Sequence, residues 1–123
     1  MNKLSENNRK NFYIIITEDA YTSEKSFSGL RFALTALVQE HTVNVFLLGA
    51  AVTLAIKGQN PKEGPNMQTW LKNINEEGGK IIACGNCCEK RGITTDILLD
   101  FVSIGSMGDL VEIAATSDIQ LMF

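Results

Sequence analysis

Phe12-Tyr13-Ile14-Ile15-Ile16 is an unbroken run of aromatic and β-branched residues. Continuous apolar runs are typical of strands covered on both faces, as in a parallel sheet. Residues 43–48 repeat the pattern with Val-Asn-Val-Phe-Leu-Leu, and shorter apolar runs occupy residues 80–84, 101–104 and 119–123. These segments predict a mainly parallel sheet of about five strands.

Amphipathic stretches separate these runs. Between residues 23 and 40, large apolar side chains recur at helical spacing, and a second such stripe begins at Met67 and ends before Gly78. A short helix is expected over residues 50–57, whereas residues 96–100 fit either a short helix or a loop. Ser106 followed by Asp109 resembles a capping box that opens a helix through about Thr116. Strand–helix alternation predicts an α/β fold with three layers.

Length and composition fit one domain and exclude several protein classes. The chain has 123 residues, of which 45% are hydrophobic and 20% charged, with a formal charge of -3. That size is typical of a single domain, which we assign to residues 12–123 after a flexible polar tail at 1–11. No apolar run is long enough for a membrane span. The slightly acidic balance argues against direct binding to nucleic acid.

The number and spacing of the cysteines indicate the cellular compartment of the protein. Cys84, Cys87 and Cys88 are odd in number and lie within five residues, unlike the framework of a secreted disulfide-rich domain. The N-terminal segment also lacks the apolar core of a signal peptide. We therefore expect a cytoplasmic protein whose thiols are reduced.

Ligands of open parallel sheets bind at the carboxyl ends of the strands, here the loops at residues 17–22, 49–51, 84–88 and 105–108. None contains a phosphate-binding glycine motif, and the first is acidic and glycine-free, so no nucleotide or flavin cofactor is expected. Glu18-Asp19 is interpreted as a solvated loop that caps the next helix, because Cys84 stands where a phosphoacceptor site would need an aspartate. His41 is expected in a surface turn at the amino end of its strand.

Cys84 is the candidate for chemistry. It closes a predicted strand, and Gly85-Asn86 turn the chain toward a helix that begins near Cys87. Backbone N–H groups at a helix start favour a thiolate, so the pKa of Cys84 is expected to lie below the free value of about 8.5. The following Lys90-Arg91 is expected to add positive charge.

Other interpretations of the cysteines stay open at this point. Free cysteine is often simply buried, so Cys84 could belong to the core. Cys84-x-x-Cys87 also has the spacing of a thioredoxin-type dithiol, although the neighbouring aromatic residue of such domains is missing. A zinc site would need a second pair of ligands, so no metal is predicted. Cys88 is expected to serve the packing of the helix.

The segment around Cys84 resembles the DsrE/DsrF-like sulfur-relay family, including its TusD-type subunits. The family pattern of strand, cysteine, short helix and Arg-Gly matches Ile81-Ile82-Ala83-Cys84-Gly85-Asn86-Cys87-Cys88-Glu89-Lys90-Arg91-Gly92-Ile93. The resemblance extends over nearly the whole chain after residue 11, including Asp19-Ala20-Tyr21 and the segments 49–58 and 105–123. It implies a flavodoxin-like, DsrE-like α/β domain.

The resemblance also implies a function. Cys84 would accept sulfane sulfur as a persulfide and pass it to a partner protein, so the chain would be a sulfur carrier, similar to a sulfurtransferase. The N–H groups from Gly85 to Cys87 would hold the anion, with Gly85 and Asn86 as its binding residues, and Cys87 would be a resolving thiol. Implied partners are donor and acceptor proteins and further copies of the chain, as a homotrimer or homohexamer. The alternative is a non-catalytic oligomeric binding or redox-regulatory domain with structural cysteines.

Overall fold

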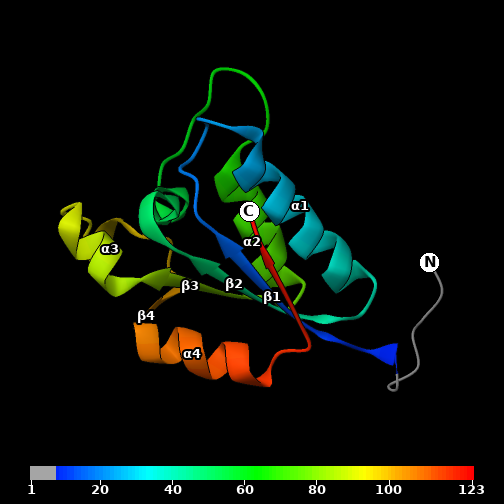
Figure 1. The fold of residues 1–123 in the computed structure, drawn as a ribbon. Helices are drawn as coiled ribbons and strands as arrows, with labels where there is room; N and C mark the ends of the chain where they lie inside the picture. The colour runs from blue at the N-terminus through cyan, green and yellow to red at the C-terminus, as the bar shows by residue number, and fades with distance from the viewer. Residues whose placement is uncertain (1–7) are drawn as a thin grey trace.

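Five parallel strands form one sheet in the order β4-β3-β2-β1-β5 (Figure 1). The structure is a computed structural model that describes residues 8–123. The central β1 pairs with β2 on one side and with β5 on the other. The strands are β1 (Asn11–Ile16), β2 (Thr42–Leu47), β3 (Lys80–Cys84), β4 (Val102–Gly105) and β5 (Ile119–Met122).

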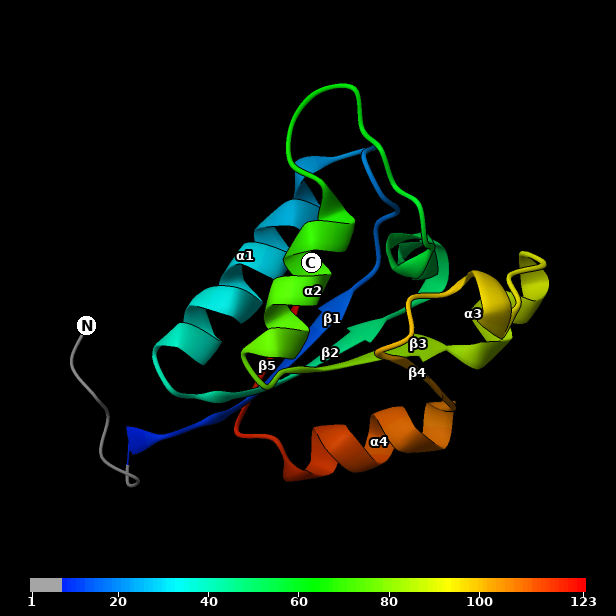
Figure 2. The same ribbon diagram turned by 180° about the vertical axis from the view of Figure 1, so that it is seen from behind.

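Helices cover the two faces of the sheet unequally. Figures 1 and 2 show α1 and α2 together on one face and α4 on the other, so the domain has three layers. A 3₁₀ helix follows β2, and α3 projects from the carboxyl end of β3. The helical segments are α1 (Glu24–Val38), η2 (Gly49–Ala55), α2 (Met67–Glu76), α3 (Gly85–Lys90), η3 (Thr95–Ile97) and α4 (Met107–Thr116).

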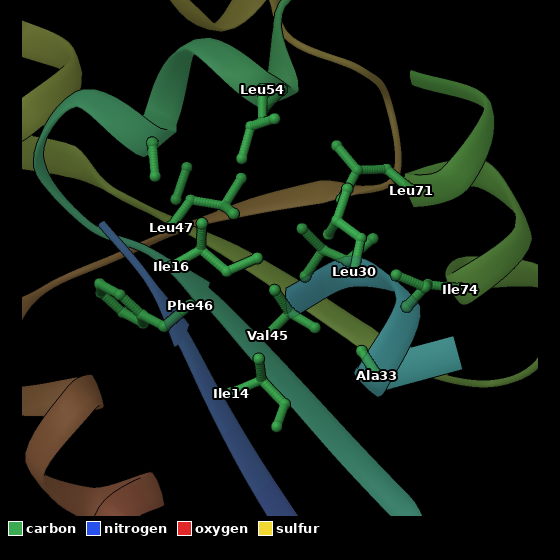
Figure 3. Packing of buried hydrophobic residues seen from close by; sticks show 14 of the residues in the cluster. Ile14, Ile16, Leu30, Ala33, Val45, Phe46, Leu47, Leu54, Leu71 and Ile74 are labelled. Atoms are coloured by element: carbon green, nitrogen blue, oxygen red, sulfur yellow. The ribbon is translucent and has the colours of Figure 1, made fainter. Parts of the chain in front are cut away.

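The main core lies between the sheet and the α1–α2 layer. Alternate strand residues point into it, and each helix adds an apolar stripe that repeats every three or four residues. Most of the side chains labelled in Figure 3 meet there and are fully buried, whereas Phe46 lies on the other face of the sheet. Those of this layer are Ile14, Ile16, Leu30, Ala33, Val45, Leu47, Leu54, Leu71 and Ile74.

The opposite face of the sheet has a smaller buried layer. Tyr13 and Phe46 are fully buried there, with their rings edge to face and centroids 6.5 Å apart. The helix above them, α4, contacts β1 and β4, yet none of its own residues is buried. One face of the sheet is therefore closely packed, and the other is only partly covered.

The structure confirms the predicted fold class, and each predicted strand lies within one residue of an observed one. The capping box of Ser106 and Asp109 is also confirmed. Two helical predictions differ. The segment after β2 forms a 3₁₀ helix, and α3 begins at Gly85 rather than near Cys87. β1 begins at Asn11, and residues 1–7 of the predicted tail lie outside the described residues.

The Tyr13 hydroxyl is buried, and no group in residues 8–123 forms a hydrogen bond with it. Burial raises the pKa of Tyr13 to about 12. An unfolded chain releases this proton near pH 10, because the pKa of free tyrosine is about 10. The stability that depends on the protonated form is therefore complete below about pH 10, and it is lost as the pH rises toward 12.

We expect Tyr13→Phe to leave the free energy of unfolding at pH 8 unchanged or slightly higher, since no hydrogen bond is lost. At pH 11 the variant should be more stable than the wild type by about 1 kcal/mol, because it lacks the proton that the unfolded wild type releases. Urea unfolding at both pH values measures the difference. A loss above about 1 kcal/mol at pH 8 would show that the hydroxyl has a partner.

Candidate functional site

Cys84 lies where β3 becomes α3. It is the last residue of the strand and the N-cap of the helix, and its Sγ accepts the N–H of Cys87 at 3.2 Å. The side chain is 7% exposed. The sulfur is thus held by a backbone donor at the carboxyl edge of the sheet.

Cys87 connects this helix to the loop after β2. Its Sγ accepts the N–H of Gly49 at 3.2 Å, and the side chain is partly exposed. Gly49 has φ +61°, a left-handed conformation that glycine adopts without strain. Each of the segments that follow β2 and β3 therefore donates one backbone N–H to a cysteine sulfur, from Gly49 to Cys87 and from Cys87 to Cys84.

Two glycines allow the next strand to approach closely. Gly105, the last residue of β4, pairs with Cys84, and a Cβ there would lie 2.5 Å from Ile82 Cγ2. A Cβ on Gly85 would lie 2.9 Å from Ile104 Cγ2. Both distances are well below normal van der Waals contact, so larger residues would separate β3 and α3 from β4.

A cavity of about 520 Å³ lies between the start of α3 and the start of α4. Cys84 and Cys87 contribute thiols to its wall, and the capping box of α4 contributes polar groups. Its apolar members include Ile104 and Met107, which are 45% and 61% exposed. The lining residues are Leu48, Cys84, Gly85, Asn86, Cys87, Ile104, Gly105, Ser106, Met107 and Asp109.

The expected low pKa of Cys84 is wrong. Burial raises the pKa of this thiol, and the neighbouring Cys87 thiol raises it further, which outweighs the lowering by the backbone groups of Cys87 and Asn86. Burial also raises the pKa of Cys88, which is 3% exposed and packs into the core as predicted. Desolvation disfavours the thiolate because the anion loses water that few N–H donors replace.

The expected positive charge is also missing from the cavity. Neither Lys90 nor Arg91 lines it. Arg91 donates from Nη1 to the carbonyl oxygen of Cys87 at 3.2 Å, so its guanidinium lies toward the other end of α3. Arg91 is thus not among the groups that shift the pKa of Cys84, although its charge acts to lower the pKa of the buried Cys88.

Two of the four predicted loops, at residues 84–88 and 105–108, line the cavity. The loop at residues 49–51 reaches it only through the hydrogen bond from Gly49 to Cys87, and the loop at residues 17–22 does not line it. That loop instead contacts η2, where Ala20 donates its N–H to Thr53 Oγ1. Ser23 caps α1, so the predicted capping role of Glu18-Asp19 is wrong. His41 lies at the amino end of β2, where its Nδ1 accepts the N–H of Lys10, in agreement with the predicted surface turn.

Sequence reasoning missed Leu48, Ile104 and Asp109 as members of the cavity. Leu48 and Ile104 fit the strand pattern, and Asp109 had a sufficient explanation as a helix cap. Only the pairing of β3 with β4 brings these residues to Cys84, and the order of strands in a sheet leaves no signal in a single sequence. The sequence offers one local clue, which is the glycine that directly follows the apolar run of β2. A glycine at such a position often marks a special turn, and Gly49 does have a positive φ.

Within residues 8–123, no group of three or more His, Cys, Asp or Glu side chains is arranged to hold a metal ion. No helix in this part of the chain is both long and apolar enough to cross a membrane.

Comparison with known proteins places this geometry in a family. Residues 10–123 match the model of the DsrE/DsrF-like family. The chain belongs to this family. It is 44% identical over 107 residues to the uncharacterized protein MJ0989 of Methanocaldococcus jannaschii, covering 87% of this chain and 94% of that protein.

A family member with a crystal structure has the same fold as this chain. Protein YchN of Escherichia coli K12 is 34% identical over 113 residues, covering 89% of this chain and 97% of YchN. The crystal structure of YchN from E. coli superposes with a TM-score of 0.89 at 33% identity, over 93% of this chain and 99% of that one. MTH1491 of Methanobacterium thermoautotrophicum, at 16% identity and a TM-score of 0.75, shares the fold over 93% of this chain and 99% of that chain.

The raised pKa of Cys84 leads to a test of its reactivity. The rate of alkylation by iodoacetamide should rise through an inflection above the free-thiol pKa of about 8.5. Cys87→Ala should move the inflection to lower pH, because the neighbouring thiol that raises the pKa is gone and the N–H of residue 87 remains. Mass spectrometry of the tryptic peptide 81–90 measures the rate at each pH.

Cys88→Ala is the matched control, since Cys88 is not among the groups that raise the pKa of Cys84. Its profile should overlay that of the wild type. An inflection below about 8.5 in the wild type would contradict the dominance of burial.

Proposed function

We propose that this protein is a sulfur carrier that accepts sulfane sulfur as a persulfide on Cys84 and passes it to a partner protein. The observation that carries the proposal is the position of Cys84 Sγ, which accepts a backbone N–H and borders a cavity at the carboxyl edge of the sheet. Membership of the DsrE/DsrF-like family supports it. Cytoplasmic location agrees with three cysteines that are all free.

The transfer step conserves atoms and electrons. The Cys84 sulfur attacks the outer sulfur of a donor persulfide R–S–SH, a new S–S bond forms, and the S–S bond of the donor breaks. The donor leaves as R–SH after taking the proton that Cys84 releases. The acceptor protein removes the outer sulfur by the same exchange, so neither step needs an oxidant or a cofactor.

The proposal gives each neighbour of Cys84 a role. A persulfide adds one sulfur atom beyond Sγ, and that atom would extend into the cavity that Gly85 and Asn86 also line. The N–H groups of these two residues would hold its negative charge, as backbone donors hold other anions. The Asn86 backbone already lowers the pKa of Cys84, although burial outweighs it.

Cys87 is assigned the role of a resolving thiol. Its thiolate would attack the Cys84 sulfur of the persulfide, forming a Cys84–Cys87 disulfide and releasing HS⁻. The sulfane sulfur is reduced and the two thiols are oxidised, so a thiol reductant of the cell must restore the site. The N–H of Gly49 on Cys87 Sγ supports this role, because it stabilises the attacking thiolate.

The contact between Cys87 and Cys84 also favours a second candidate function. The Cys87 side chain hydrogen-bonds with Cys84 and raises the pKa of Cys84, so an oxidant could join the two thiols in a disulfide without any sulfur transfer. The protein would then be a non-catalytic, redox-regulatory member of the family. Addition of sulfur distinguishes this function from the first.

The test is sulfur loading followed by intact-mass spectrometry. With the persulfide of N-acetylcysteamine as donor, the wild type should gain the mass of one sulfur atom, and Cys84→Ser should gain none. Cys87→Ser should keep the added sulfur longer, because HS⁻ is no longer released. An adduct that persists in Cys84→Ser excludes Cys84 as the carrier. A Cys87→Ser variant that gains no sulfur, beside a wild type that gains only a disulfide, supports the redox-regulatory function.

We also propose that the chain forms a homotrimer or homohexamer through α4. Apolar residues make up most of this helix, yet none is buried, and Met107 and Val111 are 61% and 60% exposed. Soluble chains seldom expose a contiguous apolar face without a partner. Because Met107 also lines the cavity, a second copy seated on α4 would complete the cavity wall.

Val111→Lys should therefore reduce the molar mass of the particle, because a charge would be buried at the interface. Val38→Lys is the matched control, since Val38 is a 48% exposed valine on the opposite layer, in α1. Size-exclusion chromatography with light scattering measures both. A monomeric wild type, or a Val111→Lys variant of unchanged mass, would contradict the assignment of α4.

A further inference from the structure

Asp109 holds a fixed position beside the thiols. Its Oδ2 accepts the Ser106 N–H at 2.7 Å and lies 3.1 Å from Ser106 Oγ, and its own N–H donates to Ser106 Oγ at 3.2 Å. The same Oδ2 lies 3.5 Å from the position that a Cβ of Gly105 would take. Since Gly105 pairs with Cys84 across the sheet, the carboxylate lies above the strand next to the cysteine.

The carboxylate is charged at neutral pH. Hydrogen bonds from the backbone N–H and the hydroxyl of Ser106 lower the pKa of Asp109, because they stabilise the ionised form. The helix start adds to this effect, since α4 has ten residues and Asp109 lies in its first turn. The negative charge is therefore a permanent part of the cavity.

No basic side chain balances this charge within the cavity. Among the described residues that line it, Asp109 is the only carboxylate, and no Lys, Arg or His is present. The rest of the wall is apolar or neutral, and its apolar members are Leu48, Ile104 and Met107. Asp109 is exposed to solvent, so water and salt screen its charge in part, but no cationic side chain of the cavity wall neutralises it.

We infer that Asp109 is a specificity-determining residue that admits sulfur donors with an uncharged reacting end and repels anionic donors such as thiosulfate. This inference rests on the proposed sulfur-carrier function and names its substrate class. Thiosulfate would bring two negative charges to the carboxylate, and like charges repel strongly at short range. A persulfide is electrophilic only as R–S–SH, and a nearby negative charge favours this protonated form over R–S–S⁻.

The chemistry balances for the favoured substrate. Cys84–SH and R–S–SH yield Cys84–S–SH and R–SH, with one S–S bond formed, one broken and one proton transferred to the leaving sulfur. No charge enters or leaves the cavity during this exchange. The corresponding reaction of thiosulfate would release sulfite, a second anion, past the same carboxylate.

Two alkylating reagents of nearly equal size measure the discrimination without sulfur transfer. Iodoacetamide is neutral and iodoacetate is an anion, and the ratio of their rates on one thiol cancels any change in its ionised fraction. We expect Asp109→Asn to reduce the preference for iodoacetamide by about threefold to tenfold at Cys84 and Cys87, because both border the cavity. Tandem mass spectrometry of peptide 81–90 assigns each product.

Asp109→Asn keeps an oxygen that can accept the Ser106 N–H, so the helix cap is retained while the charge is lost. Glu112→Gln is the matched control, because Glu112 lies on the same helix and borders a neighbouring cavity but not this one. Its rate ratio should equal that of the wild type. If Asp109→Asn proves unstable, added salt should reduce the wild-type preference by screening the carboxylate.

A rate ratio that is the same in Asp109→Asn and the wild type overturns the inference, as does a wild-type ratio that salt leaves unchanged. Sulfur loading gives the second readout, because Asp109→Asn should gain sulfur from thiosulfate that the wild type does not accept. Absence of loading from the N-acetylcysteamine persulfide would refute the carrier function alone, since the alkylation ratio does not depend on it.

Discussion

The pairing of Cys84 with Gly105 is the contact on which the site depends. It brings the end of β3 next to the end of β4, so the chain leaves the sheet twice at almost the same point, once into α3 and once toward α4. A residue with a side chain in place of Gly105 would collide with Ile82 and separate the two exits. The cavity, both of its cysteines and its carboxylate all follow from this one register.

Burial and hydrogen bonding oppose each other at the Cys84 sulfur. Removal of water disfavours the thiolate, while the N–H of Cys87 favours it, and burial is the stronger effect. On the proposed function, the outer sulfur of a persulfide would lie one bond further from the core, in the cavity, where the charge of Asp109 would favour its protonated form. Because the free Cys84 thiol is held protonated, the site would suit the proposed transfer from a bound donor better than unselective attack on electrophiles.

The fold could be predicted from the sequence because its strands are continuous apolar runs with helical stripes between them. Hydrophobic periodicity is a local signal, and it identified every strand from β1 to β5 within one residue. The position of Cys84 at the end of β3 followed from the same signal. The 3₁₀ form of η2 did not, because small and apolar residues such as Gly49-Ala50-Ala51 fit either kind of helix.

The surroundings of Cys84 were less predictable, since they depend on which segments meet in space. The expected low pKa considered only neighbours in sequence, whereas the structure adds burial by the sheet. The expected charge of Lys90-Arg91 failed for the same reason, because α3 directs Arg91 to its own carbonyl end. In the sequence, Asp109 has a sufficient role as part of the helix cap. Only the strand order reveals that it also lines the cavity of the two thiols.

The central position of β1 has a consequence for the order of folding. β1 pairs with β2 after a connection of one helix. Its other edge pairs with β5 at the end of the chain, where the hydrogen bond from Thr17 Oγ1 to the carbonyl oxygen of Phe123 joins residues 106 positions apart. Closing so long a loop costs more entropy than closing a short one, so non-local strands join late. The cysteine edge, from β2 to β4, can therefore form while the far edge of β1 is still unpaired. During that interval β1 is an exposed edge strand, and its apolar residues make it the segment most prone to pair with another chain.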